Sequence, residues 1–311
     1  MTEAPIKFKT VTLCDKGWVD ELVRAENSPS ADYNFGNIYI WDKYYRQLIA
    51  RAGDRMLVKL RYEGHPAFVF PIGSGPLRPA VELLRRFAAW RGYPLVIRGI
   101  TDRHKAMLEA EYPGGFTYAL EEKNLDYIYR AEKLATYAGK SLHGKKNHCN
   151  RFEAENDWDF VPITRELIPG CLDMLVVWNE ENAARLDPSV VFEHDALVRA
   201  FAAYEHLGLE GGALRVKGKI VGFTMGEMCS ADTFDVHFEK ADIGINGAYP
   251  MVCRELTRML LARHPGLVYI NREDDMGLEP LRRSKESYKP EYLLKKYTAR
   301  WIDGGDKEEN A

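Results

Sequence analysis

The alternation of apolar and polar residues along the first 130 positions predicts a mixed α/β domain. Residues 47–73 alternate around the turn sequences AGD and EGH, which indicates an antiparallel meander of strands. The segment 33–45 is too dense in aromatic residues to face solvent, so we expect it in the core. The remaining pattern predicts helices over 18–26, 81–91 and 102–112 and strands over 94–100 and 124–130.

The second half of the chain repeats this kind of pattern more clearly, over residues 156–303. A hairpin is predicted over 213–228, because apolar runs flank the turn KGK. The other predicted elements are helices over 171–183, 194–208, 251–264 and 277–288 and strands over 233–241, 267–271 and 291–301. We therefore predict two α/β (α+β) domains, 1–130 and 156–303, each a mixed, mostly antiparallel sheet flanked by helices. The polar segment 131–155 should connect them, and 304–311 should be a disordered tail.

Composition narrows the class of protein. A chain of 311 residues with 46% hydrophobic residues is long enough for two cores. The net charge of −3 gives no global positive field, so any contact with a polyanion has to be local. The five cysteines are scattered without a C-x-x-C pair, which favours a reducing compartment. No stretch approaches the ~20 apolar residues of a membrane-spanning helix. We therefore expect a cytoplasmic protein without stable membrane insertion.

The loop 242–249, between a predicted strand and a predicted helix, is a candidate phosphate-binding loop. Gly244 and Gly247 permit backbone conformations in which the loop turns its N–H groups toward an anion at the helix start. The residues predicted to bind a cofactor phosphate in this way are Gly244, Asn246, Gly247 and Ala248. An ordinary glycine turn explains the same residues equally well, because such turns are common in α/β folds.

The sequence YINREDDMG places polar residues at the end of an apolar strand, where α/β proteins often bind ligands. Asn271 and Arg272 could contact a bound donor, and Glu273 or Asp274 could act as a general base. A solvated charged loop is the competing interpretation. Tyr288, near the end of the last predicted helix, could protonate a leaving group, although a tyrosine there is more often part of the core.

The segment GKSLHGKKNHCNR concentrates positive charge without an acidic residue. Lys145, Lys146 and Arg151 could bind the phosphates of a polyanion, or they could belong to a solvated helix face. The spacing of His143 and His148 matches no standard metal site, so the sequence predicts no bound metal.

Four blocks of the chain resemble one known family. They are YNFGNIYIWDKYY, LHGKKNHCNRF, FEKADIGINGAYPMVCREL and YINREDDMGLEPLRRSKESYKPEYLLKKY. The family is named for the C-terminal domain of phosphatidylglycerol lysyltransferase and is related to the Fem transferases that build peptidoglycan bridges. The resemblance implies two tandem domains of the Gcn5-related acetyltransferase fold, and the order of elements in the second half resembles that fold as well.

The resemblance also implies an activity, namely transfer of an amino acid from aminoacyl-tRNA to a hydroxyl or amine of a small molecule, peptide or lipid. Lys145, Lys146 and Arg151 would then hold the acceptor stem of the tRNA. An acyl-coenzyme A donor is the alternative, but the coenzyme A loop of acetyltransferases resembles Q/R-x-x-G-x-G/A, and this chain has Gly244 and Tyr249 at its first and last positions. A non-catalytic protein that binds a metabolite or a partner is the third interpretation.

Overall fold

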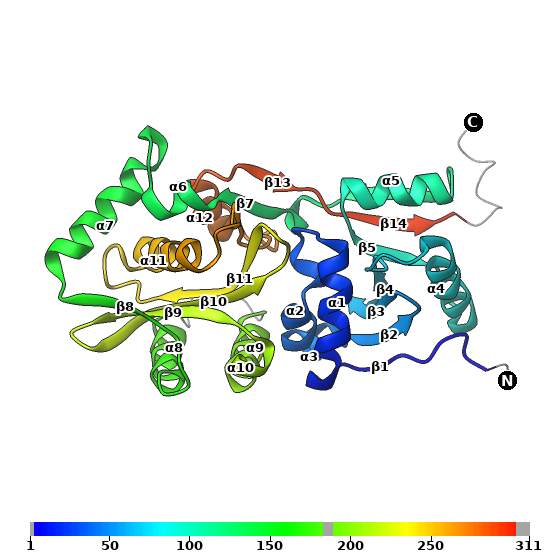
Figure 1. Cartoon of the computed structure of the whole chain (residues 1–311), viewed down its shortest axis with the longest axis horizontal. Helices are drawn as coiled ribbons and strands as arrows, with labels where there is room; N and C mark the ends of the chain where they lie inside the picture. Colours follow the sequence, from blue (N-terminus) through cyan, green and yellow to red (C-terminus); the bar gives the residue numbers. More distant parts are fainter. Residues whose placement is uncertain (1–2, 183–188, 303–311) are drawn as a thin grey trace. The chain divides into compact units, whose positions relative to one another are not determined.

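The chain divides into two compact units. The computed structural model describes residues 3–182 and 189–302. Of the described residues, unit 1 contains 3–126 and 294–302, and unit 2 contains 127–182 and 189–293 (Figure 1). The predicted tail 304–311 lies outside the described residues. No helix in the described ranges combines the length and apolar character that a bilayer span requires.

Unit 1 contains a seven-stranded sheet in the order β1-β2-β3-β4-β5-β14-β6. Only β4 and β5 pair in parallel among the registered pairs of this sheet. The predicted meander is confirmed as β2, β3 and β4. The strands are β1 (Lys9–Thr10), β2 (Leu48–Ala52), β3 (Arg55–Tyr62), β4 (His65–Val69), β5 (Val96–Ile100), β6 (Phe116–Leu120) and β14 (Tyr297–Trp301).

The helices of unit 1 follow the predicted pattern, with caps that fit the sequence. Thr101 precedes the helix α5 (Asp102–Glu111). Its side chain accepts the N–H of His104, which satisfies one of the free amides of the first turn. The aromatic segment forms two short helices, of which the first is largely buried and the second is not. The helices are η1 (Leu13–Asp15), α1 (Lys16–Glu26), η2 (Ala31–Tyr33), α2 (Phe35–Ile40), α3 (Asp42–Tyr45), α4 (Leu77–Arg91), α5 (Asp102–Glu111) and η3 (Glu122–Asn124).

Unit 2 contains a second seven-stranded sheet, in the order β13-β7-β12-β11-β10-β9-β8. Its β11 and β12 pair in parallel, whereas β7 pairs antiparallel with β12. The predicted hairpin is confirmed as β9 and β10, which continue antiparallel into β11. The strands are β7 (Asp126–Arg130), β8 (Trp158–Pro162), β9 (Glu210–Val216), β10 (Lys219–Met228), β11 (Thr233–Ala241), β12 (Tyr269–Asn271) and β13 (Tyr292–Leu294).

Helices cover both faces of this second sheet, with α11 on one side and α8, α9 and α10 on the other (Figure 1). The apolar side of α11 packs on the sheet and against α6 and α7, so the polar segment 131–155 is part of unit 2. The helices are α6 (Ala131–Thr136), η4 (Lys140–Leu142), α7 (His143–Glu155), α8 (Ile168–Asn182), α9 (Ser189–Ala202), α10 (Tyr204–Leu207), α11 (Ala248–Arg263) and α12 (Glu279–Ser287).

The two sheets have the same strand order, and each sheet contains one strand that comes from the other half of the chain. In each, a parallel pair, β4–β5 or β11–β12, is followed by an antiparallel strand from the other half of the chain. That strand is β14 in unit 1 and β7 in unit 2. The single strand predicted over 291–301 is therefore wrong. It consists of β13 in one sheet and β14 in the other, and the units do not follow the predicted domain boundaries.

Candidate functional site

The parallel strands β11 and β12 of unit 2 separate soon after they pair. Their register covers Thr233–Asp235 against Tyr269–Asn271, and β11 then continues to Ala241 while β12 ends. Ligands in α/β sheets often bind where neighbouring parallel strands part beyond their carboxyl ends. The residues that follow Asn271 and those in the second half of β11 therefore lie where a ligand site is expected.

Four side chains meet at this point, and we name Lys145, Glu239, Arg272 and Tyr288 the cation cluster. Arg272 Nη2 lies 2.7 Å from Glu239 Oε1. The Tyr288 ring, which is 2% exposed, has Arg272 Cζ 4.4 Å and Lys145 Nζ 3.8 Å from its centroid. Two cations thus share one aromatic ring, an arrangement in which the ring quadrupole favours positive charge. Three of the four residues were singled out in the sequence, for different roles, and the structure brings them together with Glu239.

The cation cluster keeps Arg272 charged and makes Lys145 easier to deprotonate. Burial by itself lowers the pKa of Arg272, but the Glu239 carboxylate outweighs it and raises this pKa well above its ordinary value. Burial, with repulsion from Arg272, lowers the pKa of Lys145. Burial raises the pKa of Tyr288 well above its ordinary value, so the phenol stays protonated. Within the described part of the chain, buried Arg272 Nη1 has no hydrogen-bond partner, which makes it a donor available to a ligand.

The loop that carries Arg272 is fixed by side chains on both sides. Lys285 donates to the backbone carbonyl oxygens of Arg272 and Asp274. Asp275 accepts hydrogen bonds from Tyr127 Oη at 2.8 Å and from Arg282 Nε at 2.7 Å, so this carboxylate helps to hold the loop in place. The loop is therefore held firmly enough to present Arg272 in one orientation.

The other polar residues predicted in this loop occupy different places. Asn271 is buried, and its Oδ1 accepts the N–H of Glu273 at 2.7 Å. Glu273 Oε1 lies 3.2 Å from His237 Nδ1, and Asp274 Oδ1 accepts the N–H of Met276 at 3.1 Å. The carboxylate that pairs with Arg272 is Glu239, which the sequence prediction did not include.

The predicted phosphate loop is shaped mainly by contacts within the protein. Gly247 has φ of +87°, and a Cβ at this position would lie 2.4 Å from the backbone oxygen of His148 on α7. His148 Nδ1 and Asn246 Oδ1 are 2.7 Å apart. The N–H of Gly244 donates to Asp242 Oδ1 at 2.7 Å, and that of Ala248 donates to Ile245 O at 3.1 Å. Two of the amides that a phosphate would need are thus already bonded, one of them to a carboxylate.

The predicted basic segment does not form one continuous surface. Lys145 is partly buried and faces Tyr288, whereas Lys146, the next residue on α7, is exposed. Arg151 is exposed and pairs with Glu155, its neighbour one helical turn away, at 2.8 Å. Only Lys145 therefore enters the cation cluster, and the other two remain candidates for a contact on the surface.

A second cluster was missed in the sequence, and we name Glu227, Asp235, His237 and Glu273 the His237 group. His237 Nε2 lies 3.1 Å from Glu227 Oε1, and His237 Nδ1 lies 3.5 Å from Asp235 Oδ2 and 3.2 Å from Glu273 Oε1. Burial lowers the pKa of His237, but its hydrogen bonds to the two glutamates outweigh burial and raise this pKa well above its ordinary value. The available signal was the strand sequence TFDVHFEKA, because charged residues at alternating positions are unusual in a strand with neighbours on both sides.

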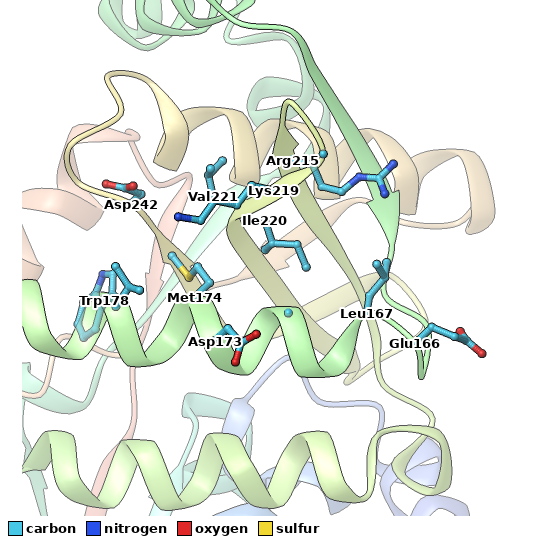
Figure 2. A pocket seen from close by; sticks show the side chains of 13 residues that line it. Glu166, Leu167, Asp173, Met174, Trp178, Arg215, Lys219, Ile220, Val221 and Asp242 are labelled. Atoms are coloured by element: carbon cyan, nitrogen blue, oxygen red, sulfur yellow. The ribbon is translucent and has the colours of Figure 1, made fainter.

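A cavity of about 380 Å³ lies elsewhere in unit 2, between α8 and the β9–β10 hairpin (Figure 2). Its lining is apolar at Met174, Trp178 and Ile220 and polar at Asp173, Lys219 and Asp242. Trp178 is fixed by a 2.9 Å hydrogen bond from its Nε1 to Tyr249 Oη. This cavity suits the apolar part of a ligand, whereas the convergent cations lie on α7 and in the loop after β12.

Comparison with known proteins places this geometry in a family. A conserved protein of unknown function from Bacteroides thetaiotaomicron is 35% identical, over 96% of this chain and 100% of that chain, with a TM-score of 0.90. FemX has the same fold, with 10% identity, a TM-score of 0.60 and coverage of 94% of this chain and 97% of that chain. This likeness confirms the predicted tandem acetyltransferase-like fold.

Sequence comparison gives the same result. The uncharacterized protein MYCGA3080 of Mycoplasmoides gallisepticum is 30% identical over 186 residues, which are 59% of this chain. The match spans 58% of that relative's length. The family model described as phosphatidylglycerol lysyltransferase, C-terminal, matches residues 24–300. The chain therefore belongs to the phosphatidylglycerol lysyltransferase C-terminal family.

Proposed function

We propose that unit 2 catalyses transfer of an aminoacyl group from aminoacyl-tRNA to an amine or hydroxyl acceptor. The observation that carries this proposal is the convergence of Lys145 and Arg272 on Tyr288 where β11 and β12 part. Acyl transfer requires positive charge or hydrogen-bond donors where the carbonyl oxygen becomes an oxyanion. The cation cluster supplies both from buried and preorganised side chains.

The reaction forms one bond and breaks one. The nitrogen or oxygen of the acceptor attacks the carbonyl carbon of the aminoacyl ester, and the bond from that carbon to the ribose oxygen breaks. The proton lost by the acceptor ends on the ribose hydroxyl. In this assignment Arg272 Nη1 and Lys145 bind the developing oxyanion, and Glu239 fixes the guanidinium at 2.7 Å. The protonated phenol of Tyr288 donates its proton to the leaving oxygen, and the proton lost by the acceptor restores the phenol, so the net movement is one proton from the acceptor to the ribose hydroxyl.

The choice of aminoacyl-tRNA over acyl-coenzyme A rests on the loop before α11. The Asp242 carboxylate accepts the N–H of Gly244, so a diphosphate would have to displace a negative group from that amide. A tRNA does not need this loop, because its phosphates can be bound by exposed cations such as Lys146 and Arg151 on α7. The family of lysyl-transferring proteins to which the chain belongs supports the same choice.

The test combines tRNA binding with turnover. Untagged protein should bind total tRNA with an affinity that falls steeply with salt, and Lys146→Met should reduce the salt slope by about one. The protein should also accelerate loss of labelled amino acids from charged tRNA when amine acceptors are added. Lys145→Met should abolish this acceleration with little change in tRNA affinity, whereas Lys217→Met serves as control, because Lys217 is exposed and does not line the cavity.

Two outcomes would contradict the proposal. Absence of salt-sensitive tRNA binding at low ionic strength would exclude aminoacyl-tRNA as the donor. Calorimetric binding of acetyl-coenzyme A, together with turnover of that donor, would instead assign the site to acyl-coenzyme A. Turnover that depends on Lys145 would exclude a purely non-catalytic binding protein.

A further inference from the structure

We propose that Asp235, His237 and Glu273 form a binding site for one divalent transition-metal ion, with Zn²⁺ as the best fit. The three ligand atoms, one from each side chain, all lie within 4.8 Å of one another. The inference concerns binding only, and it stands independently of the proposed transfer reaction.

The distances match a small four-coordinate ion. With zinc bonds of roughly 2.0–2.2 Å, two ligand atoms of a tetrahedral site lie about 3.3–3.6 Å apart. His237 Nδ1 is 3.5 Å from Asp235 Oδ2 and 3.2 Å from Glu273 Oε1. An ion can therefore bind these atoms after small side-chain rotations, and its fourth position would remain for water or another ligand.

The remaining nitrogen of His237 is already oriented as metal sites require. Glu227 Oε1 lies 3.1 Å from His237 Nε2, and a carboxylate can only accept, so Nε2 carries the proton. Ligating histidines commonly donate their second N–H to a carboxylate in this way, which fixes the ring and directs the other nitrogen at the metal. Here Nδ1 is directed at two carboxylates at once. A proton on Nδ1 can form a good hydrogen bond with only one of these carboxylates, whereas a metal ion can bind both.

The fold builds this arrangement with a β-bulge. The register of β10 against β11 shifts between Met225 and Gly226, which face Phe238 and Val236, so His237 is the extra residue of the bulge. Bulges often redirect a side chain at functional sites. Asp235 lies opposite Asn271 in the parallel register, and Glu273, two residues after Asn271, has φ of +56°.

The group has a route to solvent. Asp235 and His237 are fully buried, but the Glu273 side chain is 25% exposed. An ion can therefore enter past Glu273. Because Arg272 precedes Glu273, an ion bound there would also anchor the loop that carries the guanidinium of the cation cluster.

The experiment measures metal binding by untagged, chelator-treated protein that has been dialysed free of chelator. Zn²⁺ is titrated in competition with a chromophoric chelator, and Co²⁺ is used as a spectroscopic probe. We expect one Zn²⁺ per chain, a higher melting temperature with Zn²⁺, and the strong visible absorption of four-coordinate Co²⁺. Failure to bind Zn²⁺ would overturn the proposal. The three carboxylates would then be held together by a protonated His237 imidazole.

Variants locate the site. Glu273→Gln, which keeps a hydrogen-bonding side chain of the same size, should weaken Zn²⁺ binding by at least about tenfold, and Glu227→Gln should weaken it by about 10–100-fold through the outer-shell contact. The matched control is Glu210→Gln, because Glu210 also contacts a histidine, His264, at 2.6 Å but belongs to no three-ligand group in the described residues. Wild-type affinity in both Glu273→Gln and Glu227→Gln would overturn the assignment. Lys145→Met should bind Zn²⁺ normally, which separates this proposal from the transfer reaction.

Discussion

Replacing Gly247 by alanine should destabilise unit 2 and move α7 away from α11. Gly247 has φ of +87°, a conformation that costs an L-residue roughly 1–2 kcal/mol. The added Cβ would also lie 2.4 Å from the backbone oxygen of His148, which must therefore retreat by most of an ångström. Overpacking of this kind costs typically about 1–3 kcal/mol. The two effects together predict a loss of about 2–5 kcal/mol.

Gly218→Ala provides the matched control in the same unit. Gly218 has φ of +78°, but no atom lies within 4 Å of the position that its Cβ would take. This variant should therefore lose only the backbone part, about 1–2 kcal/mol. The difference between the two variants isolates the close approach of α7 to the loop.

Hydrogen exchange read out peptide by peptide, together with urea unfolding, measures both effects. Gly247→Ala should lower protection selectively in α7 and at the start of α11, and it should lower the urea midpoint more than Gly218→Ala does. Because Lys145 lies on α7, transfer activity should fall in Gly247→Ala and be retained in Gly218→Ala. Equal losses of stability in the two variants would refute the argument that His148 determines the need for glycine at position 247.

Three further outcomes follow from unit 1 and from the cysteines. Burial raises the pKa of Glu26, but hydrogen bonds from His104 and a backbone amide outweigh burial and lower this pKa below 4.5. The stability that the Glu26 carboxylate contributes is therefore present above about pH 4.5 and is lost as the pH falls further. Glu26→Gln should flatten this acid dependence of the melting temperature, and an unchanged pH profile would contradict the reasoning. Lys296→Met removes the amine that lies 2.7 Å from buried Asp126 and should cost about 3–5 kcal/mol in urea unfolding, whereas Lys296→Arg should retain most of the stability. Of the five cysteines only Cys14 is exposed, so a chromogenic thiol reagent should titrate one thiol per native chain and five after denaturation, and faster reaction of a second thiol would be inconsistent with the burial seen.

Local patterns were sufficient to predict most elements of the fold. The β9–β10 hairpin and α11 were predicted because their periodicity and turn residues are encoded within short stretches of sequence. Three strands, β1, β6 and β8, were missed. All three lie at sheet edges, where few side chains are buried and the apolar pattern is weak.

The exchange of strands could not be predicted in this way, because the partners of β14 are about 180–200 residues distant in the chain. Residues 291–301 read as one strand, yet they divide at Lys295 and Lys296. Buried Lys296 forms an ion pair with Asp126 in unit 1. The chain therefore changes sheets at a residue that, in the sequence alone, only interrupts the alternation of apolar and polar residues. The pairing partner, and not the local pattern, decides this boundary.

The candidate site was predicted in its parts but not in its arrangement. Lys145, Arg272 and Tyr288 were each singled out, but the sequence shows no reason why α7 and the end of α12 should meet at one ring. Glu239 and His237 were passed over because the acidic loop after β12 offered a denser cluster of carboxylates. The structure assigns Glu239 to Arg272, and the β-bulge at His237 is invisible in an alternating strand sequence.

Comparison of the two units explains why ligand chemistry is expected in unit 2. The loop between β4 and α4 corresponds in strand order to the loop between β11 and α11. In unit 1 this loop is filled from within, because Glu26 accepts the N–H of Gly73 at 3.2 Å and Arg55 donates to Gly75 O at 2.7 Å. A ligand there would have to displace buried charged groups, which is costly.

In unit 2 a different loop, the one that follows β12, is supported by the exchanged strand β7. Tyr127 and Tyr129 of β7 reach the loop after β12: Tyr127 Oη lies 2.8 Å from Asp275, and the Tyr129 ring centroid is 5.6 Å from Arg272 Cζ. The strand that leaves the first half of the chain thus supports the loop that carries the proposed oxyanion donor. Because that support comes from the first residues of unit 2, the second half of the sequence without β7 would lack both tyrosines. Strand β7 therefore contributes to the proposed transfer site of unit 2 through both of these tyrosines.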